Sequence, residues 1–323
     1  MRYYCTYFDR NYLLRGLTLY QSLKQHAQPF ILWVLCFDEW SFEVLTKLAQ
    51  PDLRPVALAD FESGDSELLA AKSARSKVEY YFTCSPSWPL YLLTQNPEID
   101  LLTYLDADLY FFSSPEPIFA ELSSDSILIV GHRFPDHLRH LELHGIYNVG
   151  LLTFRSDDTG RACLRWWRER CLEWCGIEPQ DGKFADQKYL DDWPERFPGT
   201  RVLEHAGAGL APWNWTDYTV ERSGSGIKVN GKPLIFYHYH GIKFLTRRLY
   251  DPVTLGRRYG EMPPAVRDML YRPYVAALKE TAGRLRQAGV EIGIDRTPIL
   301  DYGWRMFVSK LRRRQLMLDR DLY

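Results

Sequence analysis

The stretch LLTYLDADLYFF, residues 101–112, is apolar along almost its whole length except for two aspartates, Asp106 and Asp108. Carboxylates are among the side chains least often fully buried, and an unpaired buried charge destabilises a fold. A metal ion, a basic partner or water at the end of the strand must therefore compensate the two aspartates. Because residues two apart in a strand point to one face, we expect the two carboxylates to converge while Ala107 points away.

Strand and helix signals alternate on both sides of this stretch. The hydrophobic pattern predicts strands at 2–8, 30–37, 53–58, 126–133 and 147–155. It predicts helices at 12–26, 43–50, 66–95 and 163–174, the third of them interrupted at Pro86 and Pro89. Strands that alternate with helices form a mostly parallel sheet with right-handed crossovers. The expected fold class is therefore α/β, with a Rossmann-like central sheet flanked by helices.

The pattern changes after residue 212. The stretch 226–241 predicts a hairpin around Asn230 and Gly231, a common turn dipeptide, and helical, increasingly basic signals follow beyond residue 250. We therefore expect an α/β domain at 1–250 and a helical extension at 251–323.

The basic end of the chain has two interpretations. Residues 304–318 carry five basic and no acidic side chains. On a helix, one face would gather the apolar residues Trp304, Phe307, Val308, Leu311 and Leu318. This pattern is typical of a helix at an anionic membrane surface, and equally of a docking helix with a basic outer face.

The composition is that of an ordinary globular protein of 323 residues, with 46% hydrophobic and 25% charged residues. The formal net charge of −1 gives no sign of a nucleic-acid-binding surface. We find no secretory signal and no run of ~20 apolar residues, and the six cysteines lack the spacing of a disulfide framework. We therefore expect a cytoplasmic protein, peripheral at the inner face of the membrane if the basic end binds lipid.

The aspartate pair fits a divalent-metal site. Ligands bind at the carboxyl ends of the strands of open parallel sheets, where paired carboxylates suit Mn²⁺ or Mg²⁺. The alternative for Asp106 and Asp108 is a strand end with solvated aspartates. A second Asp-x-Asp pair at 319–321 lies in a polar tail, and we assign it no chemistry.

The stretch YLDADLYFF resembles the metal-binding Asp-x-Asp strand of GT-A fold glycosyltransferases. The resemblance is strongest to family 8, the group of glycogenin and bacterial lipopolysaccharide galactosyltransferases. Other short motifs of that family follow in order along residues 3–243. The resemblance implies a GT-A fold, with a mostly parallel central sheet and a C-terminal helical extension. It also implies that Asp106, Ala107 and Asp108 contact the donor and its metal ion.

The opening stretch YCTYFDRNYLLRGLTLYQSLKQH is similar to the family's first strand, nucleotide loop and first helix. By that resemblance, uracil and ribose are held by Thr6, Phe8, Asp9 and Tyr12. The alternative is an ordinary loop between a strand and a helix.

The segment ARSKVEYYF resembles the one in which the family places a basic residue over the nucleotide-sugar. Arg75 and Lys77 both qualify, and a solvated charge on a helix face is the alternative for each.

Two further motifs resemble the family's sugar-binding segments. In YNVGLLTFR, Asn148 would contact the transferred sugar, and Gly150 would allow a close approach of ligand or backbone. In FADQKYLDDW, Asp186 would bind sugar hydroxyls and Gln187 would lie beside the anomeric carbon. A turn for Asn148 and a helix cap for Asp186 are the alternatives.

The segment GLAPWNW resembles a Leu-Pro-x-x-Trp-Asn motif of the family, one residue short, and assigns Trp213 and Asn214 to the site. Packing is the alternative for the tryptophan.

The segment FYHYHGIKF resembles His-x-x-Gly-x-x-Lys-Pro-Trp, in which the histidine completes the metal site and the glycine and lysine contact the diphosphate. His238, Gly241 and Lys243 match, although the step to the lysine is one residue shorter and Pro-Trp is missing. His240 is the rival metal ligand. Lys232 or Arg247 are alternatives to Lys243.

The resemblance thus implies a metal-dependent transferase that moves a sugar from a UDP-sugar to a saccharide or lipid-linked saccharide acceptor, with retention of configuration. The resemblance also implies a role in cell-surface polysaccharide biosynthesis. A sugar-1-phosphate nucleotidyltransferase would need a Gly-rich, basic N-terminal loop, and TYFDRNYLLRG has one glycine and no lysine. A non-catalytic nucleotide-sugar-binding protein is the other alternative.

Overall fold

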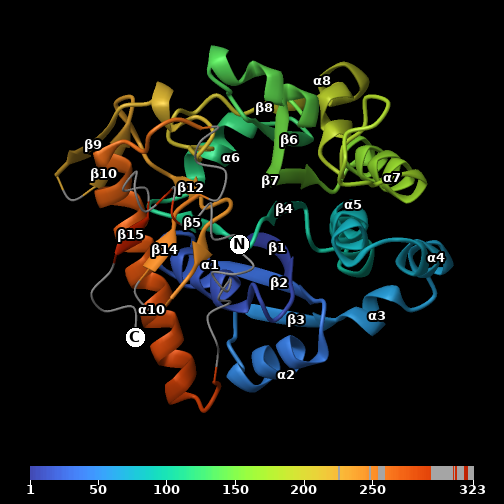
Figure 1. Cartoon of the computed structure of the whole chain (residues 1–323). Helices are drawn as coiled ribbons and strands as arrows, with labels where there is room; N and C mark the ends of the chain where they lie inside the picture. Colours follow the sequence, from blue (N-terminus) through green and yellow to red (C-terminus); the bar gives the residue numbers. More distant parts are fainter. Residues whose placement is uncertain are drawn as a thin grey trace.

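A computed structural model describes residues 1–224, 226–246, 249–253, 259–291, 308, 310 and 316–318. Its centre is a seven-stranded sheet with the strand order β3-β2-β1-β4-β7-β6-β8 (Figure 1). The strands of this sheet are β1 (Arg2–Phe8), β2 (Phe30–Cys36), β3 (Leu53–Ala57), β4 (Leu101–Leu105), β6 (Ile127–Gly131), β7 (Tyr147–Arg155) and β8 (Thr200–Val202).

Most strand pairs of this sheet are parallel. Strand β1 pairs in parallel with β2 and β4, β2 with β3, and β6 with β8, whereas β7 runs antiparallel to both β4 and β6. The predicted fold class, a mostly parallel α/β sheet with flanking helices, is confirmed.

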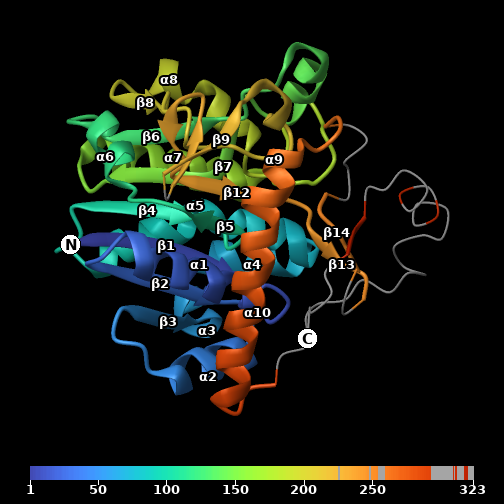
Figure 2. The same ribbon diagram turned by 90° about the vertical axis from the view of Figure 1, so that its left-hand side faces the viewer.

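Helices cover both faces of the sheet (Figures 1 and 2). The α-helices are α1 (Leu13–His26), α2 (Glu39–Leu48), α3 (Leu58–Glu62), α4 (Ser66–Ala74), α5 (Lys77–Gln95), α6 (Glu116–Leu122), α7 (Asp158–Glu173), α8 (Trp193–Arg196), α9 (Pro264–Val266) and α10 (Arg272–Gln287). The other helical elements are the 3₁₀ helices η1 (Asp136–His144), η2 (Lys188–Asp192) and η3 (Trp215–Asp217) and the π-helical turn η4 (Arg267–Tyr271).

Each face of the sheet has its own apolar core. Successive residues of β1 show the division, because Tyr4 packs into the core under α1 and α10, whereas Cys5 packs into the core under α5 and α7. Helix α10 lies along α1, where the hydroxyl of Thr18 donates to that of Thr281 at 3.1 Å (Figure 2). The C-terminal helix therefore shares a core with the α/β part, and the division at residue 250 stays a prediction.

Three small sheets complete the described part of the chain. The predicted hairpin at Asn230 and Gly231 is confirmed, with positive φ at both residues. The strands of these sheets are β9 (Val220–Ser223), β10 (Gly226–Val229) and β11 (Lys232–Pro233); β5 (Leu109–Phe111) and β12 (Phe236–His238); and β13 (Lys243–Phe244), β14 (Leu249–Asp251) and β15 (Met317–Leu318).

Two predictions about local structure are wrong. The stretch 101–112 is not one strand, because β4 ends at Leu105 and β5, which pairs with β12, belongs to another sheet. Helix α5 continues through Pro86 and Pro89, and the break comes at residues 75–76. There Ser76 and Glu79 form a reciprocal capping box that starts α5.

The basic end lies largely outside the described residues, as does the Asp-x-Asp pair at 319–321. The described residues of this segment do not form one amphipathic helix that reaches residue 318. Met317 and Leu318 form strand β15 and pair with β14, and Lys310 is buried rather than displayed on an outer face.

Candidate active site and metal centre

The two aspartates lie in a turn between two strands. After β4, the N–H of Asp106 donates to the carbonyl of Gly150 in β7 at 2.9 Å, and the N–H of Leu109 donates back to the carbonyl of Asp106 at 3.2 Å. The turn, rather than the alternation of a strand, brings the two carboxylates to the carboxyl edge of the sheet. Asp106 is half-buried and Asp108 is buried.

Backbone pairing brings His238 to the same point. Strand β12 runs antiparallel to β5 with His238 opposite Leu109, and the N–H of Tyr239 donates to the carbonyl of Asp108 at 3.0 Å. His238 Nε2 consequently lies 3.1 Å from Asp108 Oδ1 and 3.7 Å from Asp106 Oδ2. Ligand atoms from the three residues all lie within 4.8 Å of one another, which makes them a possible metal site within the described residues.

Electrostatics ties these three side chains together. Burial raises the pKa of Asp106 to about 6, against the attraction of His238. Burial acts in the same direction on Asp108, but His238 overcomes it and lowers the pKa of that carboxyl to about 2. Burial opposes the charged form of His238, yet the two carboxylates raise its pKa. The two carboxylates therefore favour positive charge at the point where the three side chains meet.

Gly150 leaves space for the histidine. A Cβ at this position would lie 2.8 Å from His238 Nδ1 and 2.5 Å from Asn148 Oδ1, closer than side chains tolerate. Asn148 accepts a hydrogen bond from the Gly150 N–H at 2.8 Å and donates through Nδ2 to Gln187 Oε1 at 3.2 Å. The start of β7 thus joins the metal-binding trio to Gln187.

Asp186 lies buried next to Gln187. The indole of Trp167 donates to the Asp186 carbonyl at 2.8 Å, and the 3₁₀ helix η2 that follows has no side-chain cap, so capping does not account for this aspartate. Burial, assisted by the charge of Asp106 and opposed by a hydrogen bond from Ser85, raises the pKa of Asp186 to about 7. Gln187 Nε2 donates to the His144 carbonyl at 3.0 Å.

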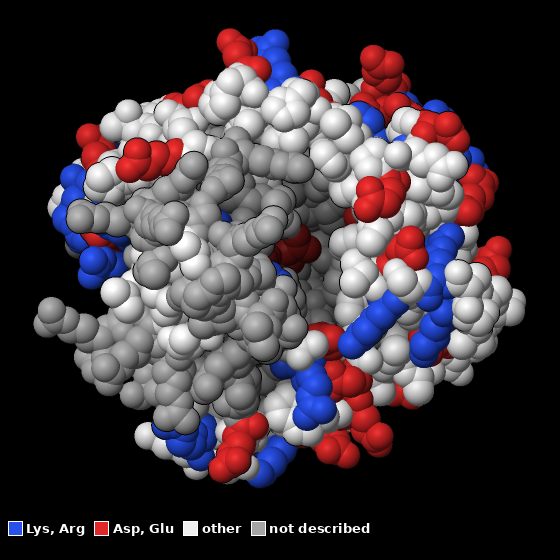
Figure 3. Space-filling view, in the orientation of Figure 1, with Lys and Arg blue, Asp and Glu red and all other residues white. Residues whose placement is uncertain are grey.

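A cavity of about 330 Å³ opens between these groups. Its lining combines polar groups with aromatic rings: Tyr7, Phe82, Asp106, His132, Phe134, Leu141, His144, Asn148, Val149, Phe184, Ala185, Asp186, Gln187, Trp213, His238, His240 and Tyr259. A concave site of this size with a few convergent polar groups is typical of small-ligand binding. In the space-filling view, Asp or Glu atoms lie deep inside a hollow of the face shown (Figure 3).

Relatives share most of the chain's length. It is 36% identical over 251 residues to the uncharacterized protein YfnF of Bacillus subtilis (strain 168). The aligned region covers 75% of this chain and 82% of YfnF. It is 30% identical over 289 residues to the uncharacterized protein YfnD of the same organism, covering 88% of this chain and 91% of YfnD. The chain belongs to the family of YfnF and YfnD. No protein-family model matches it.

Solved structures identify the fold. A galactosyltransferase, LgtC, in complex with donor and acceptor sugar analogs superposes with a TM-score of 0.52 at 14% identity, over 88% of this chain and 99% of LgtC. The glycosyltransferase GlyE of Streptococcus pneumoniae TIGR4 superposes with a TM-score of 0.50 at 14% identity, over 92% of this chain and 66% of GlyE. The fold is that of the GT-A glycosyltransferases, as the Asp-x-Asp resemblance predicted.

The residues predicted to bind the nucleotide divide into two groups. Thr6 and Phe8 are buried, and the Phe8 ring packs where a Cβ on Gly16 would be, so both side chains belong to the interior. Asp9 follows β1 at the sheet edge and accepts from Lys77 Nζ at 2.8 Å. Tyr12, 41% exposed, lies directly before α1. Of these residues, Tyr12 and Lys77 are exposed to a ligand, whereas the Asp9 side chain is only 8% exposed.

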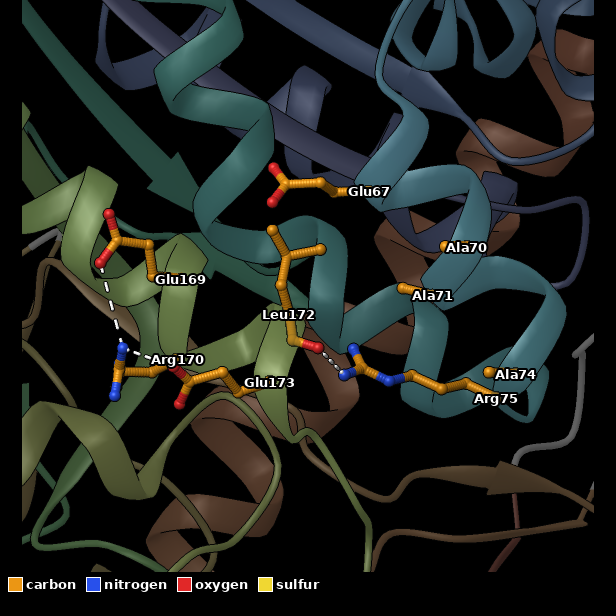
Figure 4. Close-up of a pocket in the computed structure, with 9 residues that line it drawn as sticks. All are labelled: Glu67, Ala70, Ala71, Ala74, Arg75, Glu169, Arg170, Leu172 and Glu173. Atoms are coloured by element: carbon orange, nitrogen blue, oxygen red, sulfur yellow. Dashed lines mark hydrogen bonds and ion pairs between the residues drawn. The ribbon is translucent and has the colours of Figure 1, made fainter.

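Arg75 is held elsewhere, in a groove between α4 and α7 (Figure 4). Its guanidinium donates to the carbonyls of Cys171 at 2.7 Å and Leu172 at 2.5 Å, and also to the hydroxyl of Thr83. Arg75 thus caps the end of α7, whereas Lys77 contacts the edge of the sheet.

Asn214 is fully buried and does not line the cavity. Its amide donates to the carbonyls of His132 and Gly209 and accepts from the Ala211 N–H, so it fixes the loop that presents Trp213. The Trp213 ring contacts the His238 ring edge to face, with centroids 5.3 Å apart. The resemblance assigned Asn214 to the donor, and its position here suits a supporting contact.

The loop after β12 carries the remaining predicted residues. Gly241 has a φ of +75°, which favours glycine, and Lys243 is exposed at the start of β13. Lys232 is exposed in β11 on a separate small sheet, and Arg247 lies outside the described residues. His240 lines the cavity but is not part of the metal-binding trio, so the geometry favours His238.

Several cavity residues were not predicted from the sequence. His132 follows β6, stacks on Phe134 at 4.6 Å, and lies 3.4 Å from Asn148 Nδ2. A signal for His132 existed, since it lies at the carboxyl end of a predicted strand, 126–133. Arg15 of α1 lies outside the cavity lining but donates to the Ile242 carbonyl of the neighbouring loop at 3.1 Å. No signal in the sequence pointed to it, because only the folded chain brings α1 to this loop.

Proposed function

We propose that this protein is a metal-dependent glycosyltransferase that moves a sugar from a UDP-sugar to a saccharide or lipid-linked saccharide acceptor, with retention of configuration. The observation that carries the proposal is the trio of Asp106, Asp108 and His238, whose ligand atoms lie within 4.8 Å of one another beside the 330 Å³ cavity. The GT-A fold and the Asp-x-Asp sequence support it.

The donor atoms of the trio fit a divalent cation. Two carboxylates and one imidazole suit Mn²⁺, and the nitrogen ligand makes Mg²⁺ the weaker choice. When bound, the ion would supply Lewis-acid stabilisation of the charge that develops on the leaving nucleoside diphosphate. Lys243, exposed on the neighbouring loop, is the proposed further cation for the diphosphate.

Residues on the β7 side of the metal site would bind the transferred sugar. The amides of Asn148 and Gln187, joined at 3.2 Å, can donate to and accept from sugar hydroxyls. The buried carboxyl of Asp186 would accept from a hydroxyl and so orient the ring. The aromatic rings of Phe134, Phe184 and Tyr259 also line the cavity, and such rings suit stacking of a sugar.

A donor-binding experiment tests the proposal. Thermal unfolding is measured with UDP, UDP-glucose, UDP-galactose and their N-acetyl forms, with and without Mn²⁺. A ligand at 100 times its Kd stabilises the fold by about 2.7 kcal/mol, so a bound donor gives a clear shift. We expect Mn²⁺-dependent stabilisation by one UDP-sugar, abolished in D106N and in D108N.

The exposed Asp60 supplies the matched control, because D60N makes the same chemical change away from the site and is expected to keep the shift. Release of UDP from the stabilising donor then separates a transferase from a non-catalytic binding protein. No shift with any UDP compound in the wild-type protein would contradict the proposal.

A further inference from the structure

His132 is a buried imidazole in the wall of the cavity, directly after β6. Its backbone is fixed on both sides, because its N–H donates to the Ile146 carbonyl and its carbonyl accepts from Asn214 Nδ2, each at 2.9 Å. Its ring stacks on Phe134 with centroids 4.6 Å apart and meets the Trp213 ring edge to face at 5.0 Å. The imidazole is therefore held in one position between two aromatic rings.

The hydrogen bonds of Asn148 determine which ring nitrogen of His132 carries the proton. Asn148 Oδ1 accepts from the Gly150 N–H at 2.8 Å, so the Nδ2 amide group faces the other way. Nδ2 lies 3.4 Å from His132 Nε2 and can only donate, so Nε2 accepts and the proton of the neutral ring lies on Nδ1. Burial lowers the pKa of His132 to about 3, which keeps the ring neutral at physiological pH.

The same order of donors and acceptors continues to Gln187. The second N–H of Asn148 Nδ2 donates to Gln187 Oε1 at 3.2 Å, and Gln187 Nε2 donates to the His144 carbonyl at 3.0 Å. Each amide is thus turned in one sense, and the His132 ring accepts one of the two Asn148 protons. This orientation leaves a lone pair on both amide oxygens and one N–H of Gln187 for a ligand.

The imidazole destabilises the fold in a way that an apolar ring would not. Within the described residues, His132 Nδ1 is buried without a hydrogen-bond partner. A buried donor without a partner lowers stability, whereas a phenylalanine would fill the space between Phe134 and Trp213 without one. The one side-chain hydrogen bond that His132 makes there is to Asn148, a proposed sugar-binding residue. An unfavourable buried group with such a single contact is typical of a functional constraint.

We propose that His132 is a positioning residue that sets the orientation of the Asn148 and Gln187 amides toward the transferred sugar. The ring acts through Nε2 as an acceptor and does not itself contact the sugar. This inference rests on the proposed function, because it assumes that the cavity binds the sugar of a nucleotide-sugar. It adds a residue that the resemblance of the sequence did not assign.

Three substitutions separate the possible roles of the ring. H132F keeps an aromatic ring and removes both nitrogens. H132Q can place an amide oxygen near the position of Nε2, and H132N can place an amide group near the position of Nδ1. His26 supplies the control, because it is a half-buried histidine of α1 that does not line the cavity, so H26F makes the same chemical change elsewhere.

Calorimetric titration in Mn²⁺ measures the affinity for UDP and for the UDP-sugar that stabilises the wild-type protein. UDP lacks the sugar, so all four variants should bind it within about twofold of the wild type. We expect H132F and H132N to bind the UDP-sugar about fivefold or more weakly, whereas H132Q and H26F stay within about twofold. The thermal midpoint of metal-free H132F should equal or exceed the wild-type value, because the substitution removes the unpartnered donor.

UDP-sugar binding by H132F at wild-type strength would overturn the inference. So would H132Q that binds the UDP-sugar no more tightly than H132N, since the ring would then not act through Nε2, and this comparison holds even if H132F does not fold. Equal weakening of UDP and the UDP-sugar in H132F, or a midpoint below that of the wild type, would indicate a structural role and overturn it as well. If the wild-type protein binds no UDP-sugar, the proposed function itself fails.

Discussion

Gly150 shows how one missing Cβ leaves space for a candidate metal ligand. The distances of 2.5 Å to Asn148 Oδ1 and 2.8 Å to His238 Nδ1 mean that G150A must displace one or both side chains. Because groups that orient a metal ligand contribute roughly 10–100-fold in metal affinity, we expect G150A to weaken Mn²⁺ binding by at least about tenfold. Calorimetric titration with Mn²⁺ measures this change in affinity.

Gly131 provides the control for that substitution. It ends the neighbouring strand β6, and its nearest neighbour to an added Cβ lies at 3.5 Å, an ordinary contact. G131A should bind Mn²⁺ as the wild-type protein does. Unchanged Mn²⁺ affinity in G150A would mean that His238 is not a ligand in the position described.

Asp186 is expected to reduce stability at neutral pH. Its pKa rises from 3.8 to about 7 on folding because the carboxyl is buried, so the folded chain holds the proton more tightly than the unfolded chain. Stability should therefore fall as the pH increases from about 4 towards 7. At ~1.4 kcal/mol per pKa unit, D186N should gain up to roughly 4 kcal/mol at pH 8 and much less at pH 5.

Urea unfolding of the metal-free protein at the two pH values measures this gain. Activity should be lost in the same variant, since the amide cannot replace the carboxylate as a hydrogen-bond acceptor for a sugar hydroxyl at both oxygens. A D186N protein that is less stable than the wild type at pH 8 would show that the carboxyl is held ionised by contacts other than those described.

The sequence predicts elements better than the points at which they end. Residues 101–112 are apolar on both sides of the aspartates, so the hydrophobic pattern cannot show that β4 pairs with β7 while β5 pairs with β12. Pairing between segments more than a hundred residues apart decides that break, and it is also what brings His238 to Asp108. The start of α5 carried a local signal that the prediction of one helix over 66–95 missed, because Ser76 and Glu79 have the spacing of a capping box.

At the scale of elements, Arg75 joins the break between α4 and α5 to the end of α7. Two carbonyls of α7 and the hydroxyl of Thr83 share its guanidinium, and burying those acceptors without a donor is costly. R75M should therefore lower the free energy of unfolding by about 1–3 kcal/mol while leaving the affinity for UDP unchanged. Urea denaturation and nucleotide titration of one preparation give both values.

Arg54 is the comparison for this variant, since it donates to a single carbonyl, that of Pro51, from an exposed position. R54M should change stability by less than about 0.5 kcal/mol. If R75M instead kept its stability and lost nucleotide binding, Arg75 would be the basic residue at the donor and the assignment to α7 would be wrong.

At the scale of the whole molecule, a buried ion pair joins the C-terminal segment to the sheet beside the site. Lys310 donates to Asp251 and, at 2.7 Å, to the Val253 carbonyl, and the two charged side chains are 3% and 1% exposed. Asp251 lies in β14 opposite Lys243 of β13, and β15 adds to the other side of β14. Contact with a membrane through the basic end stays a prediction, but Lys310 is not one of the charges displayed there. No helix within the described residues is long and apolar enough to cross a bilayer.

Removing one partner of this ion pair should lower the free energy of unfolding more than replacing both partners with apolar groups. K310M removes the ammonium that bonds to the buried Asp251 carboxylate, and changes of this kind typically cost about 3–5 kcal/mol. The double variant K310M/D251L replaces both charges with apolar groups, so it should recover at least half of that loss. Urea unfolding of the wild-type protein and the two variants provides the comparison.

If the double variant is no more stable than K310M, the carboxylate is not the source of the lost stability, and the C-terminal segment is not anchored through this pair. If K310M alone has no effect, the segment does not belong to the folded molecule in solution.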